Sequence, residues 1–187
     1  MKKLLLPITV ALLMFSCAKH QPKFAINGTL PSKEYDGETI YLTPAMDANK
    51  SNVDSTIIRD GKFTITGDTE RVGILRLKPM LRMKIQELLV VTEAGNIQAY
   101  LGPNSIGGGT PQNELLQQWK EQVMRCNKDF AMMQAAKTDS ANEMEIKAKT
   151  EKYDMSDAAL KTFTQEIIHK HKGTTLQKFL SNITGER

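Results

Sequence analysis

The sequence predicts an α+β protein, with an N-terminal antiparallel β-sandwich or partly open barrel of about seven strands followed by a long antiparallel helix pair. Between residues 23 and 109, short runs that alternate apolar and polar residues are separated by turn residues, which is typical of half-buried strands. After residue 110, apolar residues recur every three or four positions, which is the period of one helix face. The glycine-rich stretch 107–109 lies where the period changes.

Strand-like segments follow one another at regular intervals through the β domain, residues 23–109. They are residues 24–26, 39–42, 53–58, 63–66, 72–78, 85–91 and 97–101. Asp60-Gly61 lies between two alternating runs, and this pair readily adopts the positive φ angles of a type I′ turn, so we expect a tight hairpin there. About seven short strands favour a sandwich or a partly open barrel.

Residues 110–187 are predicted to form a helical hairpin extension. The first helix spans about 113–137, with one apolar face formed by Leu116, Trp119, Val123, Cys126, Phe130 and Met133. The second spans about 142–172, with a similar stripe of Tyr153, Leu160, Phe163 and Ile167. Gly173 is a plausible stop, and Leu176, Phe179 and Leu180 suggest a final short helix. A helix of about 30 residues reaches about 45 Å, so we expect part of the pair to project beyond the β domain.

The glycine-rich loop 107–109 has two interpretations. A glycine-rich loop before a helix can bind phosphate. However, no G-K-[ST] sequence and no alternating βαβ pattern surround it. Thr110 as helix N-cap with Pro111 at the first helical position explains the same residues without a ligand, and we favour this interpretation.

The N-terminal residues 1–16 have the composition of a signal peptide. Lys2 and Lys3 precede an apolar run that is too short for a membrane-spanning helix. The stretch 13–17, Leu-Met-Phe-Ser-Cys, resembles a bacterial lipobox, although Met14 and Phe15 are unusual there. The resemblance implies cleavage before Cys17, lipidation of Cys17 and a tether over residues 17–22. The alternative is an ordinary signal peptide with Cys17 at the cut site by chance.

This anchor implies a location in the cell envelope. Several acyl chains hold a protein firmly at a membrane, so the membrane is the expected partner of the N-terminus. Ala18 rather than aspartate follows Cys17, which by resemblance to known sorting rules favours the outer membrane, facing the periplasm.

The charge of the chain gives little support to a nucleic-acid partner. Removing Lys2 and Lys3 lowers the formal net charge from +4 to +2, and no basic stripe with interleaved aromatic residues remains. A locally basic segment runs through Arg71, Arg76, Lys78, Arg82 and Lys84. It could face anionic lipid or an acidic polymer, but a solvated strand face whose charges discourage edge pairing is the favoured interpretation.

The cysteines and histidines do not form a recognisable catalytic or metal site. If Cys17 is acylated, Cys126 is the only thiol left, which rules out a disulfide within the chain and a C-x-x-C motif. Cys126 has helical spacing from Val123 and Phe130, so burial as a small apolar residue is favoured over a reactive thiol. His169 and His171 could touch a metal but lack further ligands nearby, so a solvated helix end is favoured. We expect no catalytic residues, no metal and no cofactor.

Several short motifs together resemble the domain of unknown function 4369, found at the N-terminus of ResA/TlpA-like thiol-disulfide oxidoreductase lipoproteins of Bacteroidota. The resemblance is carried by residues 24–28 (FAING), 40–42 (IYL), 53–56 (VDST), 60–63 (DGKF), 93–97 (EAGNI) and 109–113 (GTPQN). In that family the catalytic C-x-x-C lies in a thioredoxin-like domain, which residues 1–187 do not contain. The resemblance therefore implies a location and a fold but transfers no catalytic residue.

Two functions are expected from these observations. The first is a non-catalytic envelope lipoprotein whose β domain and helix pair bind an envelope protein or a small molecule. The second is a truncated or split accessory domain that docks a separate thioredoxin-like oxidoreductase. The third alternative is an enzymatic activity of the domain itself.

Overall fold

The computed structural model of the chain describes residues 23–139 and 142–186. The strands in these residues are β1 (Phe24–Thr29), β2 (Thr39–Pro44), β3 (Asp54–Ile57), β4 (Lys62–Gly67), β5 (Val72–Arg76), β6 (Leu88–Val91), β7 (Gly95–Tyr100) and β8 (Ile106–Gly108). The helices are α1 (Pro111–Thr138), α2 (Glu143–Lys170) and α3 (Thr175–Thr184), with short 3-10 turns η1 (Lys33–Tyr35) and η2 (Pro79–Leu81). Cys17 and the predicted tether 17–22 lie outside the described residues.

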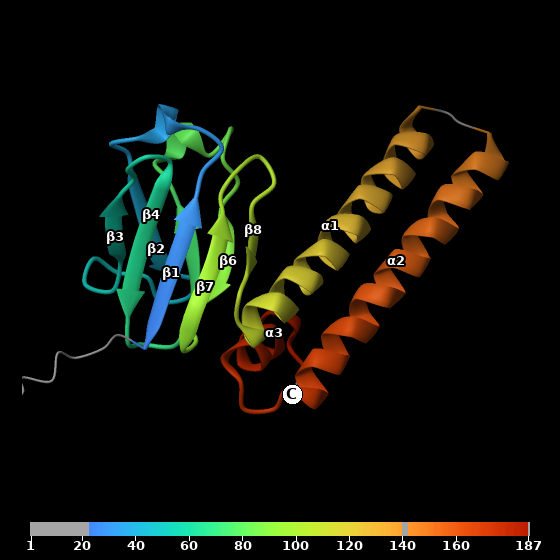
Figure 1. Cartoon of the computed structure of the whole chain (residues 1–187). Coiled ribbons are helices and arrows are strands. Elements are labelled where there is room, and N and C mark those ends of the chain that lie inside the picture. Colours follow the sequence, from blue (N-terminus) through green and yellow to red (C-terminus); the bar gives the residue numbers. More distant parts are fainter. Residues whose placement is uncertain (1–22, 140–141, 187) are drawn as a thin grey trace, which may run out of the picture.

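The strands form two four-stranded sheets that pack face to face, which confirms the predicted sandwich (Figure 1). Sheet A has the order β4-β1-β7-β8, and sheet B has the order β3-β2-β5-β6. Alternate residues of each strand point between the sheets and are removed from water. The residues of this core that are least exposed are Ile26, Ile40, Leu42, Ile58, Leu75, Val90, Ile97 and Leu101.

One strand pair departs from the expected antiparallel arrangement. β1 and β7 run parallel at the centre of sheet A, with Ile26 opposite Ile97, whereas every other strand pair of the described residues is antiparallel. The chain passes through all of sheet B between these two strands, so it can return to sheet A in the same direction. Parallel neighbours need such a long crossover, whereas antiparallel neighbours need only a short turn.

The turn at Asp60-Gly61 has the predicted geometry but a different role. Both residues have positive φ angles, 53° and 65°, as a type I′ turn requires. The flanking strands, however, belong to different sheets, and only the pair next to the turn is bridged. The Asp36 carboxylate accepts hydrogen bonds from the backbone N–H groups of Asp60 (3.0 Å) and Gly61 (2.8 Å). Ile58 is fully buried just before the turn, so the turn connects the two sheets over the core.

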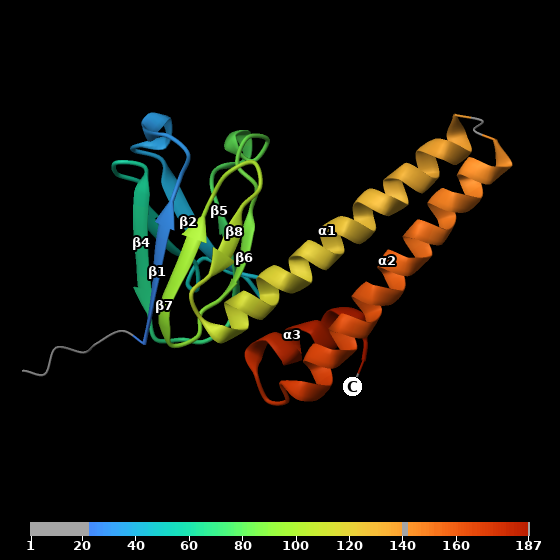
Figure 2. The same ribbon diagram turned by 45° about the vertical axis from the view of Figure 1, so that its right-hand side comes forward.

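The helices α1 and α2 form an antiparallel pair whose far half extends away from the sandwich (Figures 1 and 2). Trp119 of α1 donates a hydrogen bond to the Thr164 hydroxyl of α2 (3.0 Å). Farther along the pair, Asp129 lies 3.0 Å from Lys152, and this interaction lowers the pKa of the Asp129 carboxyl. No helix in the described part of the chain is sufficiently long and apolar to span a membrane.

The predicted apolar face of α1 is largely the face that packs on α2. Leu116, Cys126 and Met133 are buried, as the spacing predicted. Phe130 is 42% exposed, because it lies at the edge of the helix pair. There its ring contacts the ring of Tyr153 in a tilted arrangement, with the two ring centroids 5.3 Å apart.

A second apolar cluster joins the helices to the outer face of sheet B. Val72 and Val91 lie opposite each other on β5 and β6 and point away from the sandwich core. They pack against residues from all three helices, namely Leu116, Ile167, Ile168, Leu176 and Leu180. Burial of these side chains holds α3 and the near ends of α1 and α2 against the sandwich.

The start of α1 is fixed to the sandwich by two polar side chains, Asn113 and Glu93, which we call the α1 joint. Asn113 is 2% exposed, and its amide accepts a hydrogen bond from the Val91 N–H (2.9 Å) and donates to the Val91 carbonyl (2.7 Å) and the Thr110 hydroxyl (2.8 Å). The Glu93 carboxylate accepts from the N–H groups of Gln112 (2.6 Å) and Asn113 (3.3 Å). Glu93 thus satisfies first-turn donors that a capping side chain would otherwise bind.

Candidate functional site

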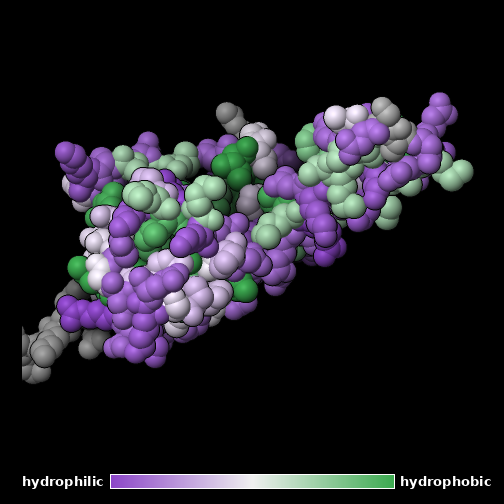
Figure 3. Space-filling view, turned by 90° about the horizontal axis from the view of Figure 1, so that it is seen from above, coloured by the Kyte–Doolittle hydropathy of each residue, from purple (hydrophilic) through white to green (hydrophobic). Residues whose placement is uncertain are grey.

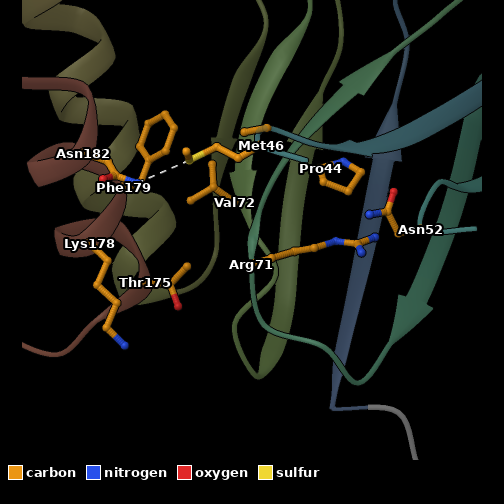
Figure 4. Close-up of a pocket in the computed structure, with 10 residues that line it drawn as sticks. Pro44, Met46, Asn52, Arg71, Val72, Thr175, Lys178, Phe179 and Asn182 are labelled. Atoms are coloured by element: carbon orange, nitrogen blue, oxygen red, sulfur yellow. Dashed lines mark hydrogen bonds between the residues drawn. The ribbon is translucent and has the colours of Figure 1, made fainter. Parts of the chain in front are cut away.

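A pocket of about 310 Å³ lies between α3 and the two central strands of sheet B, where β2 ends and β5 begins (Figure 4). We call it the α3 pocket. It is lined by Pro44, Ala45, Met46, Asn52, Arg71, Val72, Thr175, Lys178, Phe179 and Asn182. Its volume is at the lower end of the range for small-molecule sites.

The spacing of residues along α3 determines which of its side chains line the α3 pocket. Leu176 and Leu180 are fully buried against the second apolar cluster and fix the orientation of the helix. The residues that line the pocket, Thr175, Lys178, Phe179 and Asn182, have spacings of three, one and three, so they share the neighbouring helix face. The opposite wall is the end of β2, where Pro44 is buried and cannot donate a further ladder hydrogen bond.

Apolar side chains form the floor of the pocket, and polar groups surround it. Val72 is 8% exposed, and Phe179 is partly buried against the same apolar cluster. Met46 extends across the mouth, where Asn182 donates a weak hydrogen bond to its sulfur at 3.6 Å (Figure 4). A surface of this kind suits a ligand with an apolar body and a polar end.

Arg71 provides the most distinctive polar group of the pocket. One terminal nitrogen of its guanidinium lies 2.8 Å from the Asp54 carboxylate, which fixes the side chain. Its Nε is buried and has no hydrogen-bond partner among the described residues. A buried donor without a partner is unfavourable, and the guanidinium that carries it extends toward Asn52 and away from α3 (Figure 4).

A carboxylate beside the pocket connects α3 to α1. Glu70 accepts hydrogen bonds from the Gln112 amide (2.9 Å) and the Thr175 hydroxyl (2.7 Å), and these two bonds lower the pKa of its carboxyl. The side-chain oxygen of Gln112 in turn accepts from the Leu176 N–H (2.9 Å). The positive charge of Lys178 lowers the pKa of Glu70 further. The first turn of α3 is therefore held in place by polar contacts as well as by burial.

The chemistry of the lining residues suits binding. The described residues that line the pocket include no histidine, cysteine or serine, and their hydroxyl and amine groups come from Thr175 and Lys178. No group of three or more histidine, cysteine, aspartate or glutamate side chains gathers anywhere in residues 23–139 and 142–186 in a way that could hold a metal ion.

The cysteines and histidines singled out in the sequence lie in different parts of the chain, and none of those that the structure describes lines the α3 pocket. Cys17, the predicted lipidation site, lies outside the described residues. Cys126 is a free, buried cysteine, 7% exposed, on the face of α1 that packs on α2, so its predicted burial is confirmed. His169 and His171 lie at the C-terminal end of α2, as expected for a helix end.

Thr110 and Pro111 after the glycine-rich loop have the predicted positions at the start of α1. Gly107 and Gly108 belong to β8, Thr110 is the N-cap of α1, and Pro111 is its first residue. The Thr110 side chain makes no capping hydrogen bond, because Glu93 binds the first-turn N–H groups instead.

The locally basic segment is largely neutralised by carboxylates. Arg71 pairs with Asp54 as described above. The other pairs are Arg76 and Arg82 with Glu87, at 3.2 and 3.1 Å, and Lys78 with Glu38, at 2.5 Å. These pairs support the interpretation of the segment as a charged surface rather than a site for an acidic polymer.

The α3 pocket was not predicted from the sequence. The spacing of Leu176, Phe179 and Leu180 indicated the helix, and the same spacing could have shown that Thr175, Lys178 and Asn182 share a face beside Phe179. Nothing local indicated that this face would lie opposite Pro44 and Arg71.

A family model described as "Domain of unknown function (DUF4369)" matches residues 24–116. No curated protein and no solved structure matches the chain significantly. The match covers the sandwich and the first turns of α1, so the Arg71 side of the α3 pocket lies inside it and the α3 side lies beyond it. Residues 24–116 of this chain are therefore similar to DUF4369, a domain of unknown function.

Proposed function

We propose that this protein is a non-catalytic cell-envelope lipoprotein that binds a small ligand in the α3 pocket. The observation that carries the proposal is the pocket itself, in which an apolar lining of Val72, Pro44 and Phe179 lies next to the buried, unpartnered Nε of Arg71. A ligand with an apolar body and a hydrogen-bond acceptor satisfies both features. Lys178 adds a positive charge at the rim, so an anionic acceptor is favoured.

The anchor is proposed to be a lipid on Cys17, with the chain at the outer membrane facing the periplasm. The lipobox resemblance of residues 13–17 supports it. In Figure 1, β1 begins at the same end of the sandwich at which α3 lies, and the end of α1 and the start of α2 lie toward the opposite end. A tether of residues 17–22 spans at most about 20 Å. An anchor there would place the sandwich and the α3 pocket close to the membrane and direct the helix pair away from it.

Titration with 8-anilinonaphthalene-1-sulfonate, an apolar anion whose fluorescence rises in apolar sites, tests the pocket. We expect saturable binding by the parent protein and at least about tenfold weaker binding by Phe179→Ala and by Arg71→Gln, because each removes one side of the site. Phe130→Ala is the matched control, since Phe130 is a partly exposed phenylalanine far along the helix pair. Equal binding by Phe179→Ala and Phe130→Ala would refute the site.

Metabolic labelling with a palmitate analogue tests the anchor. The parent chain is expected to incorporate the label and to fractionate with the outer membrane, and Cys17→Ala is expected to lose both properties. Unchanged labelling of Cys17→Ala contradicts the anchor. Reproducible hydrolase or reductase turnover by the purified protein contradicts the non-catalytic assignment.

The second candidate is an accessory domain that docks a separate thioredoxin-like oxidoreductase. It is favoured by the projecting helix pair, whose tip carries hydrophobic residues among hydrophilic ones (Figure 3). Met144 and Met155 of α2 are 82% and 74% exposed. If this candidate holds, a C-x-x-C thioredoxin-like frame lies next to the coding sequence, and its product co-purifies with the parent chain but not with a Met144→Glu, Met155→Glu variant. Absence of such a frame removes the support for it.

A further inference from the structure

The outer face of sheet A has an unusual composition for an exposed sheet surface. Its outward residues carry amides, hydroxyls and one aromatic ring, and the only charged side chain that its strands contribute within the described residues is Lys62. The outward residues are Ala25, Asn27, Thr29, Lys62, Thr64, Thr66, Asn96, Gln98, Tyr100, Ile106 and Gly108. Solvated sheet faces usually carry more charge, so this face has a composition suited to hydrogen bonding with a neutral ligand.

A row of polar side chains crosses this face. The strand register places Thr64, Asn27, Gln98 and Gly108 side by side on β4, β1, β7 and β8. Neighbouring strands are about 4.8 Å apart, so the row extends the polar surface across the sheet. The Thr64 hydroxyl donates to the Asn27 side-chain oxygen (3.3 Å). In the described residues, the Asn27 amide nitrogen and the whole Gln98 amide have no protein partner, so their hydrogen bonds are available to a ligand.

The next row contains a tyrosine ring whose hydroxyl end packs closely on Gly102. Tyr100 follows Gln98 on the same face of β7 and has Thr29 and Ile106 as neighbours in register. A Cβ atom at Gly102 would lie 2.9 Å from Cε1 and 3.1 Å from Oη of Tyr100, so the ring covers Gly102 directly. The hydroxyl end of the ring is therefore packed, and the side chain is still 39% exposed. The exposed part of the ring offers a stacking surface next to the polar row.

The first turns of α1 form a wall along one side of these rows. Glu114 accepts a hydrogen bond from the Gly109 N–H (2.7 Å), and Gln117 accepts from the Gly107 N–H (3.1 Å). Gly108 permits this approach, because a Cβ atom there would lie 2.7 Å from the Glu114 carboxylate. The result is an open groove of about 510 Å³, which we call the sheet A groove.

We propose that the sheet A groove binds a neutral oligosaccharide. A pyranose ring has an apolar C–H face, which stacks on an aromatic ring, and an edge of hydroxyl groups that donate and accept hydrogen bonds. Tyr100 provides the stacking surface, the amides of Asn27 and Gln98 bind the hydroxyl edge, and Glu114 accepts from a hydroxyl at the wall. The groove is lined by a carboxylate and by no cation, which favours a neutral sugar over an acidic one.

This site is independent of the function proposed for the α3 pocket. The sheet A groove is formed by β1, β7, β8 and the start of α1, whereas the α3 pocket lies between α3 and the central strands of sheet B, and the two share no lining residue. Binding at one site can therefore fail while binding at the other is retained.

A microarray of immobilised neutral, N-acetylated and acidic oligosaccharides, probed with the fluorescently labelled protein, tests the proposal. The N-acetylglucosamine tetramer and cellotetraose serve as soluble probes for calorimetric titration. We expect the parent protein to retain neutral glycans, Tyr100→Ala to bind about tenfold more weakly and Gln98→Ala about fivefold more weakly. Tyr100→Phe keeps the stacking surface and should stay within about threefold of the parent.

Tyr41→Ala is the matched control, because Tyr41 lies in sheet B and has nearly the same exposure, 38%, as Tyr100. Thermal melting of each variant confirms that it is folded. Loss of glycan retention by Tyr100→Ala with retention by Tyr41→Ala supports the proposal. Failure of the folded parent protein to retain any neutral glycan overturns it, as does retention of acidic glycans alone or equal weakening by the two alanine variants.

Discussion

Replacement of Asn113 by aspartate probes the α1 joint with the smallest possible change in shape. The variant keeps an acceptor for the Val91 N–H but loses both bonds donated by the amide nitrogen, to the Val91 carbonyl at 2.7 Å and to the Thr110 hydroxyl at 2.8 Å. Each lost bond contributes about 1 kcal/mol, and a buried carbonyl left without a partner costs a further 1–3 kcal/mol, roughly. We therefore expect Asn113→Asp to lower the free energy of unfolding by at least about 3 kcal/mol at pH 7.

Thermal unfolding followed by circular dichroism measures this effect. For a chain of this size, about 3 kcal/mol corresponds to a fall in Tm of about 6–12 °C. The introduced carboxyl is buried, which raises its folded-state pKa, and in the protonated form it can again donate a hydrogen bond. The difference from the parent should therefore be largest at neutral pH and shrink as the pH falls toward about 4. Asn127→Asp, on the exposed face of the same helix, is the control. If the two variants melt together at pH 7, the reasoning is wrong.

Three further predictions concern other contacts. Gly109→Ala and Gly173→Ala both place a side chain at a φ near +87°, but only at Gly109 would the new Cβ atom lie 2.6 Å from a backbone oxygen. In urea unfolding, Gly173→Ala should therefore lower the free energy of unfolding by about 1 kcal/mol, and Gly109→Ala should lower it by clearly more. Because the pKa of Glu70 is lowered in the folded state, its contribution is present above the ordinary pKa of about 4.3 and is lost as the pH falls through the folded-state value. The stability of Glu70→Gln should therefore fall less steeply below about pH 4 than that of the parent, and parallel pH profiles would contradict this assignment. Leu180→Ala should destabilise the protein by about 3 kcal/mol and abolish dye binding in the α3 pocket, whereas Ile183→Ala, at a position that is 50% exposed, should do neither.

The local patterns of the sequence predicted the elements well because each pattern has a direct physical cause. Alternation of apolar and polar residues identified seven of the strands, and the spacing of three and four residues identified the three helices. The type I′ turn at Asp60-Gly61 followed from the conformational preference of that pair. The eighth strand, β8, was missed because Ile106-Gly107-Gly108 is short and rich in glycine.

The contacts that create the sites depend on pairings between distant residues, and periodicity does not report them. The parallel pairing of β1 with β7 brings Asn27 and Gln98 side by side, although 70 positions separate them. Glu93 binds the first turn of α1 from the loop before β7. Phe179 faces Pro44 across the α3 pocket because Leu176 and Leu180 bind the outer face of sheet B. In each case the local sequence indicated the element, and long-range packing determined its neighbour.

The rigid attachment of α1 makes the helix pair a lever arm. The 28 residues of α1 give a length of about 42 Å, and the Asn113 and Glu93 contacts lie within its first turn. A rotation of about 5° at that fulcrum would carry the far end of the helix about 4 Å, which is most of one helical turn. Movements of β6 too small to disturb the sandwich core would thus be amplified about 40 Å away. Fluorescent labels at Thr138 and on the sandwich would measure the distance between the far end of α1 and the sandwich. A small ligand-induced rotation at the start of α1 would appear as a change of several ångströms in that distance.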